Sequence, residues 1–160
     1  YAVTNMAAFL VVSAVYNATG KEEIGDFAGL AQRAPLLALV LAVALFSLAG
    51  MPFFAGFVSK FYLFNAAASQ GLLWLAGLAI FASLISLYYY LAIVQQMYIE
   101  PAPDPSAIHV PKLTTGLLGV LFVGIVFVGV YPAPVMEAIT SASDTVMSSE
   151  GVIRLVLSLD

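Results

Sequence analysis

The sequence predicts an all-α integral membrane protein with four transmembrane helices, the second of them discontinuous. Two observations predict this class. Of the 160 residues, 62% are hydrophobic and only 9% are charged, whereas an ordinary soluble domain is about 25% charged. The apolar residues also gather in long runs, and a helix needs ~20 of them to cross a bilayer core. Polar surface this scarce cannot cover a soluble globule of this size.

The composition also excludes several kinds of site. The chain has no cysteine and a single histidine, His109, which rules out disulfides, thiolate metal sites and cysteine nucleophiles. The sequence also has no basic patch of the kind that would indicate a nucleic-acid partner. The chain begins with "YAVTNMAAFLVVSAVY", without an initiator Met or the basic n-region of a signal peptide. We therefore expect this chain to be part of a longer membrane protein, with its first residues lying inside a transmembrane helix that has been cut.

The expected spans cover residues 1–17, 35–69, 72–98 and 113–131. Between the first two, apolar residues recur at helical spacing among charges, which is typical of a short amphipathic helix at the interface. The segment 100–112 is rich in proline and predicts a loop. The tail, 136–160, is mixed, and its run "VIRLVLSL" is too short to span and predicts an interfacial helix or strand.

The second span is too long for one straight helix. Pro35 opens it in the first turn, where proline fits, and the 34 residues from 36 to 69 would extend ~51 Å. Gly50, Pro52 and Gly56 interrupt the run, so it is either one discontinuous helix or two short ones. The connection at 50–56 is apolar, which argues against an exposed hairpin. We favour one broken helix.

Loop charges support this choice. With four spans, the loops 18–34 and 100–112 share one side of the membrane, and their basic residues are Lys21, Arg33 and Lys112. The other side has a short turn near residue 70 and the tail, with one basic residue against four acidic ones. The positive-inside rule then predicts that both loops are cytoplasmic and that the tail is outside. Two full spans would put the basic loops on opposite sides.

Lys60 is the candidate functional residue. Of the fourteen Lys, Arg, Asp and Glu residues, it alone lies inside an apolar span. A charge at a helix centre costs ~2.5–3.5 kcal/mol on insertion scales, and such residues usually mark an ion or proton path. An ammonium group removed from water also loses its proton more readily. The alternative is snorkelling, but the helix end is ~15 Å away, which strains a lysine stem.

The helix break strengthens the hypothesis. A break frees backbone groups that lipid cannot satisfy, so it is tolerated where it is buried or lines a cavity, and transporters use such helices at polar sites. Gly56 leaves an open position one turn before Lys60, and Ser47 and Ser59 offer short proton relays. The alternative is a proline kink that serves packing alone.

Three consecutive tyrosines end the third span. Tyr88, Tyr89 and Tyr90 point in different directions around a helix, which is typical of an aromatic belt at the cytoplasmic interface. One hydroxyl would alternatively join a hydrogen-bonded chain. Glu100, Asp104 and His109 belong to the proline-rich loop, where we expect them to be solvated.

Two stretches resemble a known family. "FAGLAQRAPLLALVLAVALFSLAGMPFFAGFVSKFYLFNAA" followed by "SLISLYYYLAIVQQMYIEP" is similar to the C-terminal part of the subunit N family of proton-pumping NADH–quinone oxidoreductase, respiratory complex I. The resemblance covers about residues 1–135. It implies a fourteen-helix antiporter-like subunit, of which this chain is the last four helices. Two positions depart from the pattern: Phe53 replaces a frequent second proline, and Ser59 a frequent glycine.

The resemblance implies a function. Lys60 would match the family's lysine near the exit of the proton path, in the inner membrane of a prokaryote. The expected partners are the lipid bilayer and other membrane subunits, and protons are the transported species. No cofactor is expected in this chain; NADH, FMN, iron–sulfur clusters and quinone belong to partner subunits. A cation/proton antiporter subunit and a non-conducting scaffold remain as alternatives.

Overall fold

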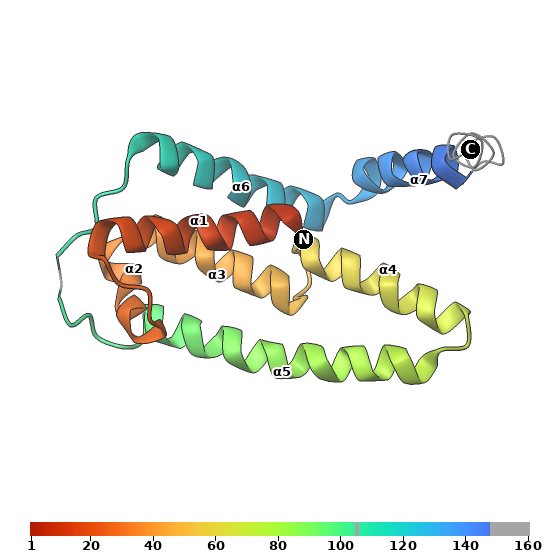
Figure 1. The fold of residues 1–160 in the computed structure, drawn as a ribbon, viewed down its shortest axis with the longest axis horizontal. Coiled ribbons are helices and arrows are strands. Elements are labelled where there is room, and N and C mark those ends of the chain that lie inside the picture. Colours follow the sequence, from red (N-terminus) through yellow and green to blue (C-terminus); the bar gives the residue numbers. More distant parts are fainter. Residues whose placement is uncertain (105, 148–160) are drawn as a thin grey trace, which may run out of the picture. The chain divides into compact units, whose positions relative to one another are not determined.

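The computed structural model describes residues 1–104 and 106–147, and every regular element in them is a helix. Residues Tyr1–Val130 form one compact unit, and α7 belongs to a second unit that begins at Tyr131. The all-α class predicted from composition is confirmed. The elements, drawn in Figure 1, are α1 (Ala2–Thr19), the short 3-10 helix η1 (Ile24–Phe27), α2 (Leu30–Arg33), α3 (Pro35–Ala49), α4 (Ala55–Ser69), α5 (Leu73–Tyr98), α6 (Lys112–Val130) and α7 (Ala133–Met147).

Helix α3 is the centre of the first unit. It contacts α1, α2, α4, α5 and α6. A helix that is apolar on every side is typical of a position surrounded by other helices, and α3 is apolar along nearly its whole length. Its alanines let the neighbouring backbones approach closely. The buried residues of α3 are Leu37, Ala38, Val40, Leu41, Ala42, Val43, Ala44, Leu45 and Ser47.

Three helices of the described residues, α1, α5 and α6, are each long and apolar enough to cross a membrane. Helices α3 and α4 have 15 residues each, or ~22 Å, which is short of a ~30 Å bilayer core. The two follow one another in the same direction, and α5 returns in contact with both (Figure 1). Together they form one crossing, so the predicted discontinuous second helix is confirmed.

The two basic loops lie at the same end of the first unit (Figure 1). The N–H of Ile108 donates a hydrogen bond to the carbonyl of Arg33 at 3.1 Å, and the N–H of Gly29 donates to the carbonyl of Gln96 at 3.1 Å. The turn at Gln70 and Gly71 lies at the opposite end. This arrangement follows if the segment 35–69 crosses once, as we expected.

The segment 18–34 differs from the single amphipathic helix that its spacing predicts. Helix α1 continues to Thr19, and the rest contains two short helices, η1 and α2, of four residues each. Gly29 separates them with a left-handed φ of 64°, and a side chain there would collide with Ala102. Phe27 and Leu30 are buried. The two short helices pack against α5, and Gly29 between them lies against Ala102.

The tail is helical where the structure describes it. Helix α7 covers Ala133–Met147, so the first part of the tail 136–160 continues a helix that starts just before it. The run "VIRLVLSL", for which we expected an interfacial helix or strand, lies outside the described residues.

Candidate functional site

Helix α3 ends in a hydrogen-bonded left-handed turn. Gly50 has φ 86°, and its N–H donates to the carbonyls of Phe46 and Ser47 at 3.1 and 3.0 Å. The N–H of Met51 donates to the Phe46 carbonyl at 3.0 Å. This is the pattern of a Schellman cap, which satisfies carbonyls left open at a helix end and favours glycine at the left-handed position. The predicted role of Gly50 in ending the helix therefore has a structural basis.

The chain then continues into α4 through Pro52 and Phe53. Phe53 has φ 75°, the sole positive φ of a non-glycine residue in the described part of the chain. Proline, with φ held near −65°, could not adopt this conformation, so the departure at position 53 matters to the local backbone. Phe54 is extended and precedes the first residue of α4.

Ser47 fastens the two half-helices together. Its Oγ accepts a hydrogen bond from the N–H of Gly56 at 3.0 Å and lies 3.3 Å from the Oγ1 of Thr4 in α1. The exposed fraction is 0% for Ser47 and 2% for Thr4. A Cβ at Gly56 would collide with the carbonyl of Ser47. Gly56 is therefore needed for the close approach of α4 to the end of α3.

Lys60 reaches back across the break. Its Nζ donates to the carbonyl oxygen of Ala49 at 3.0 Å and to the Oγ of Ser83 at 3.1 Å. Ala49 is the last residue of α3, so its carbonyl has no partner further along the helix. The negative end of the helix dipole also lies there and favours a cation. The ammonium group thus joins the end of α3 to the middle of α5.

A cavity of about 300 Å³ surrounds this contact. No carboxylate of the described residues lies within ion-pair distance of Lys60. Among the lining residues, Lys60 is the sole titratable group, and Ser83 the sole other polar side chain. Apart from Lys60 and Ser83, the lining consists of Ala49, Gly50, Met51, Pro52, Phe57, Phe61, Phe64, Ile80, Leu84 and Leu87. Lys60 is therefore the one charged group among these lining residues, most of which are apolar.

Several residues singled out in the sequence lie outside this cluster. Ser59 is exposed, and its hydroxyl bonds to the carbonyl of Ala55 in its own helix at 3.4 Å. Tyr88 and Tyr89 are exposed and stack edge to face with their ring centres 5.6 Å apart. Tyr90 packs partly against the core. None of the three tyrosines lines the Lys60 cavity, whereas Ser47 takes part in the helix break.

Thr4 and Ser83 were missed from the sequence. Their partners are 43 and 23 residues away, so no local pattern pairs them. The available signal was a lone hydroxyl within an apolar helix, and Ser86 gives the same signal without facing the cavity. Selecting Ser83 over Ser86 requires the rotation of α5 relative to α4, which only the packed structure provides.

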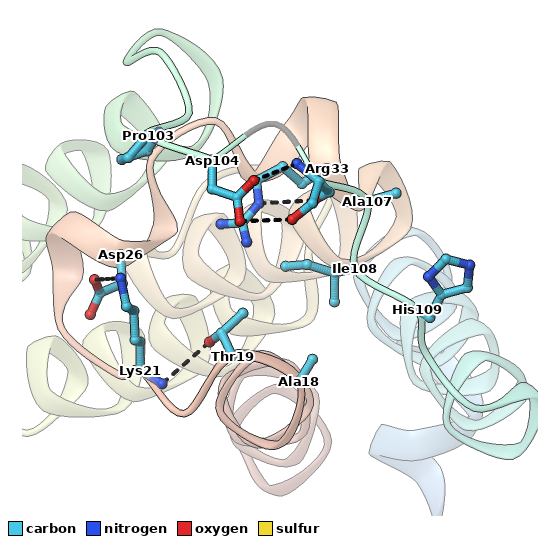
Figure 2. Close-up of a pocket in the computed structure, with 11 residues that line it drawn as sticks. Ala18, Thr19, Lys21, Asp26, Arg33, Pro103, Asp104, Ala107, Ile108 and His109 are labelled. Atoms are coloured by element: carbon cyan, nitrogen blue, oxygen red, sulfur yellow. Dashed lines mark hydrogen bonds and ion pairs between the residues drawn. The ribbon is translucent and has the colours of Figure 1, made fainter.

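A second, larger cavity of about 520 Å³ lies where the two basic loops meet (Figure 2). The Nζ of Lys21 lies 3.9 Å from the Oδ1 of Asp26 there, and the Nε of Arg33 donates to the carbonyl of Ser106 at 3.3 Å. The backbone N–H and hydroxyl of Ser106 both bind Asp104 and, with a smaller effect of Arg33 and Lys21, lower the pKa of its carboxyl. One of these contacts is an ion pair, between Lys21 and Asp26, whereas Arg33 and Asp104 both bind Ser106.

Figure 2 shows His109 at the edge of this loop cavity, turned away from the two aspartates. No group of three or more metal-binding side chains occurs among the residues that the structure describes. The loop cavity lies between two connections, and the Lys60 cavity is the candidate functional site. Helices long and apolar enough to cross a membrane, with a further pair broken in mid-run beside a lysine, define the chain as a multi-pass membrane protein.

Comparison with known proteins agrees with this class. A family described as "NADH:quinone oxidoreductase/Mrp antiporter, TM" matches residues 1–86. The NADH-quinone oxidoreductase subunit N of Desulfitobacterium hafniense is 44% identical over 149 residues, which cover 91% of this chain and 30% of that protein. The chain belongs to the NADH:quinone oxidoreductase/Mrp antiporter membrane family. It spans about 30% of the length of the curated relatives it matches.

Two solved structures share the fold. The structure of the Mrp complex from Dietzia sp. DQ12-45-1b contains a chain that superposes with a TM-score of 0.85 at 22% identity, covering 97% of this chain and 37% of that one. Respiratory complex I from Thermus thermophilus gives a TM-score of 0.67 at 25% identity, covering 82% of this chain and 32% of that chain. The antiporter-like fold inferred from the resemblance is confirmed.

Proposed function

We propose that this chain belongs to a proton-translocating membrane subunit of an NADH–quinone oxidoreductase, in which Lys60 carries the proton. One observation supports this most directly. Lys60 lies inside a membrane crossing, at a helix break, with two neutral acceptors and no carboxylate partner among the described residues. A charge held in this way is costly, which argues for a use other than packing.

The geometry supports a simple cycle. In the protonated state the ammonium group binds the Ala49 carbonyl and Ser83, and the dipole of α3 stabilises its charge. After the proton leaves, that electrostatic stabilisation is lost and the apolar lining favours the neutral amine. The proton would pass to a water-filled half-channel towards the outer face. Such an exchange needs no redox group in this chain.

The partners and orientation are part of the proposal. The relatives are named as subunits of NADH-quinone oxidoreductase, which supports neighbouring membrane subunits as partners. NADH, FMN, iron–sulfur clusters and quinone would be bound by partner subunits of the complex. The basic loops 18–34 and 100–112 would face the cytoplasm of a prokaryote, and the tail would lie outside. The two basic loops lie at the same end of the first unit, which supports their placement on the same side of the membrane.

Replacing Lys60 by Ala in the full-length subunit tests the function. Proton translocation in membranes that hold the assembled complex should fall at least about tenfold, because a positioned proton carrier contributes about 10²–10⁴-fold in acid–base chemistry. Ser59→Ala is the matched control, since its hydroxyl bonds only within α4. Normal translocation by an assembled Lys60→Ala complex would reject the proposal and favour a scaffold.

A second candidate function is a cation/proton antiporter subunit. The family description includes the Mrp antiporter, and the Dietzia Mrp complex contains the same fold. Co-purification separates the two functions. A complex that reduces quinone with NADH supports the first, and a complex without this activity that exchanges cations for protons supports the second.

A further inference from the structure

Ser83 lies near the middle of α5. It is ten residues, ~15 Å, from the start of that helix at Leu73 and fifteen residues, ~22 Å, from its end at Tyr98. Its side chain is half-buried and lines the Lys60 cavity between Ile80 and Leu84. A hydroxyl this far from both ends of an apolar helix has few polar neighbours, so its partner inside the protein matters.

The bonding of Ser83 differs from that of the next serine in the same helix. A helical serine commonly bonds to a carbonyl one turn back, and Ser86 does so, with its hydroxyl 3.1 Å from the Ala82 carbonyl. The oxygen of Ser83 instead accepts a hydrogen bond from the Nζ of Lys60. Of the two serines in α5, Ser83 therefore contacts the lysine, whereas Ser86 makes an ordinary bond within its own helix.

Ser83 offers what the second acceptor, the Ala49 carbonyl, lacks. A carbonyl oxygen only accepts hydrogen bonds, whereas a hydroxyl both accepts and donates. The Ser83 hydroxyl can therefore accept from the charged ammonium group and donate to the lone pair of the neutral amine. α3 and α5, the helices that enclose the cavity with α4, contribute no titratable side chain to its lining.

We propose that Ser83 is a positioning residue for Lys60, holding its nitrogen at the end of α3 in both the protonated and the neutral state. This inference rests on the proposed function, because it assigns Ser83 a role only if Lys60 carries the proton. The contact joins α4 to α5 across the apolar cavity and fixes the lysine in one orientation.

Ser83→Ala in the assembled complex tests the inference, with proton translocation measured as a function of pH. Loss of a hydrogen bond to a charged group should reduce translocation about tenfold at neutral pH, and should move the alkaline limb of the profile about one unit lower. Ser83→Thr, which keeps the hydroxyl, should restore both. Ser86→Ala is the matched control and should behave as the wild type.

Two outcomes would overturn the inference. One is a Ser83→Ala complex with wild-type rate and pH profile; the other is an equal loss in Ser83→Ala, Ser83→Thr and Ser86→Ala without a shift in pH, which would indicate packing alone. Lys60→Ala separates this from the proposed function. If Lys60→Ala is inactive and Ser83→Ala is normal, the role of Ser83 alone is rejected; if Lys60→Ala is active, the proposed function is rejected.

Discussion

The hydroxyl of Ser47 stands at the point where two half-helices meet, and it satisfies a backbone N–H that lipid could not. The Gly56 N–H is in the first turn of α4, where no carbonyl of the same helix is available. Ser47 accepts its hydrogen bond and contacts Thr4, so α1, α3 and α4 meet at one buried polar cluster. The break is held by particular side chains.

Ser47→Ala should therefore destabilise the fold. Removing the acceptor leaves a buried N–H unsatisfied, which costs about 1–3 kcal/mol of unfolding free energy. The melting temperature of the purified complex in detergent measures the effect. Thr4→Ala is the control, because it leaves the bond between Gly56 and Ser47 in place, and its loss should be smaller. Equal melting temperatures for Ser47→Ala and wild type would contradict the role of Ser47.

At this scale the sequence predicted Lys60 but not its partners. A lysine in an apolar span is conspicuous because the transfer of a charge into lipid is costly. Ser47 was expected to relay protons, and the structure places it in the helix break, 0% exposed. Ser83 and Thr4 are unremarkable in sequence, since their roles arise from contacts between separate helices.

At the scale of elements, the end of α3 and the side chain of Lys60 meet at Gly50. A Cβ at Gly50 would lie 2.8 Å from the Cδ of Lys60, and the φ of 86° already disfavours any side chain. Gly50 thus permits both the left-handed cap and the return of the lysine stem. This explains why the glycine, the break and the charge occur together.

Gly50→Ala should lower proton translocation as well as stability. The left-handed conformation costs an alanine roughly 1 kcal/mol, and the added methyl group displaces Lys60 from Ala49. Gly20→Ala is the matched control: Gly20 also caps a helix, with φ 71°, but a Cβ there meets nothing within 4 Å. We expect both variants to lose stability and only Gly50→Ala to lose translocation. Equal translocation by the two would contradict the contact.

The elements differ in how far the sequence determined them. The break in the second span was predicted because Gly50 and Pro52 interrupt a run too long for one helix. The segment 18–34 was not predicted correctly, since Gly29 adopts its left-handed φ for a close approach to Ala102. Ala102 is 73 positions away in sequence, so the spacing of apolar residues within 18–34 cannot predict this contact.

At the scale of the whole molecule, the number of crossings decides which loops share a side. The segments 18–34 and 100–112 meet through hydrogen bonds from Ile108 and Arg33. This contact requires an even number of crossings between them. The pair formed by α3 and α4 together with α5 provides two, which agrees with the count from loop charges.

Labelling of introduced cysteines tests this topology, since the chain has none of its own. Glu22→Cys and His109→Cys should react with an impermeant maleimide from one side of the membrane, and Gln70→Cys from the other. All three positions are exposed. Inverted membrane vesicles should expose the first two, if the basic loops are cytoplasmic. Labelling of positions 22 and 70 from the same side would contradict a single broken crossing.

The central claim is that Lys60 carries a proton and is not merely a fixed charge. Lys60→Arg tests it most directly, because arginine keeps the charge and the hydrogen-bond donors but does not release its proton. The measurement is proton translocation per NADH oxidised in membranes that contain the assembled complex. We predict that Lys60→Arg loses translocation to the same extent as Lys60→Ala. Translocation at the wild-type level in Lys60→Arg would contradict the account.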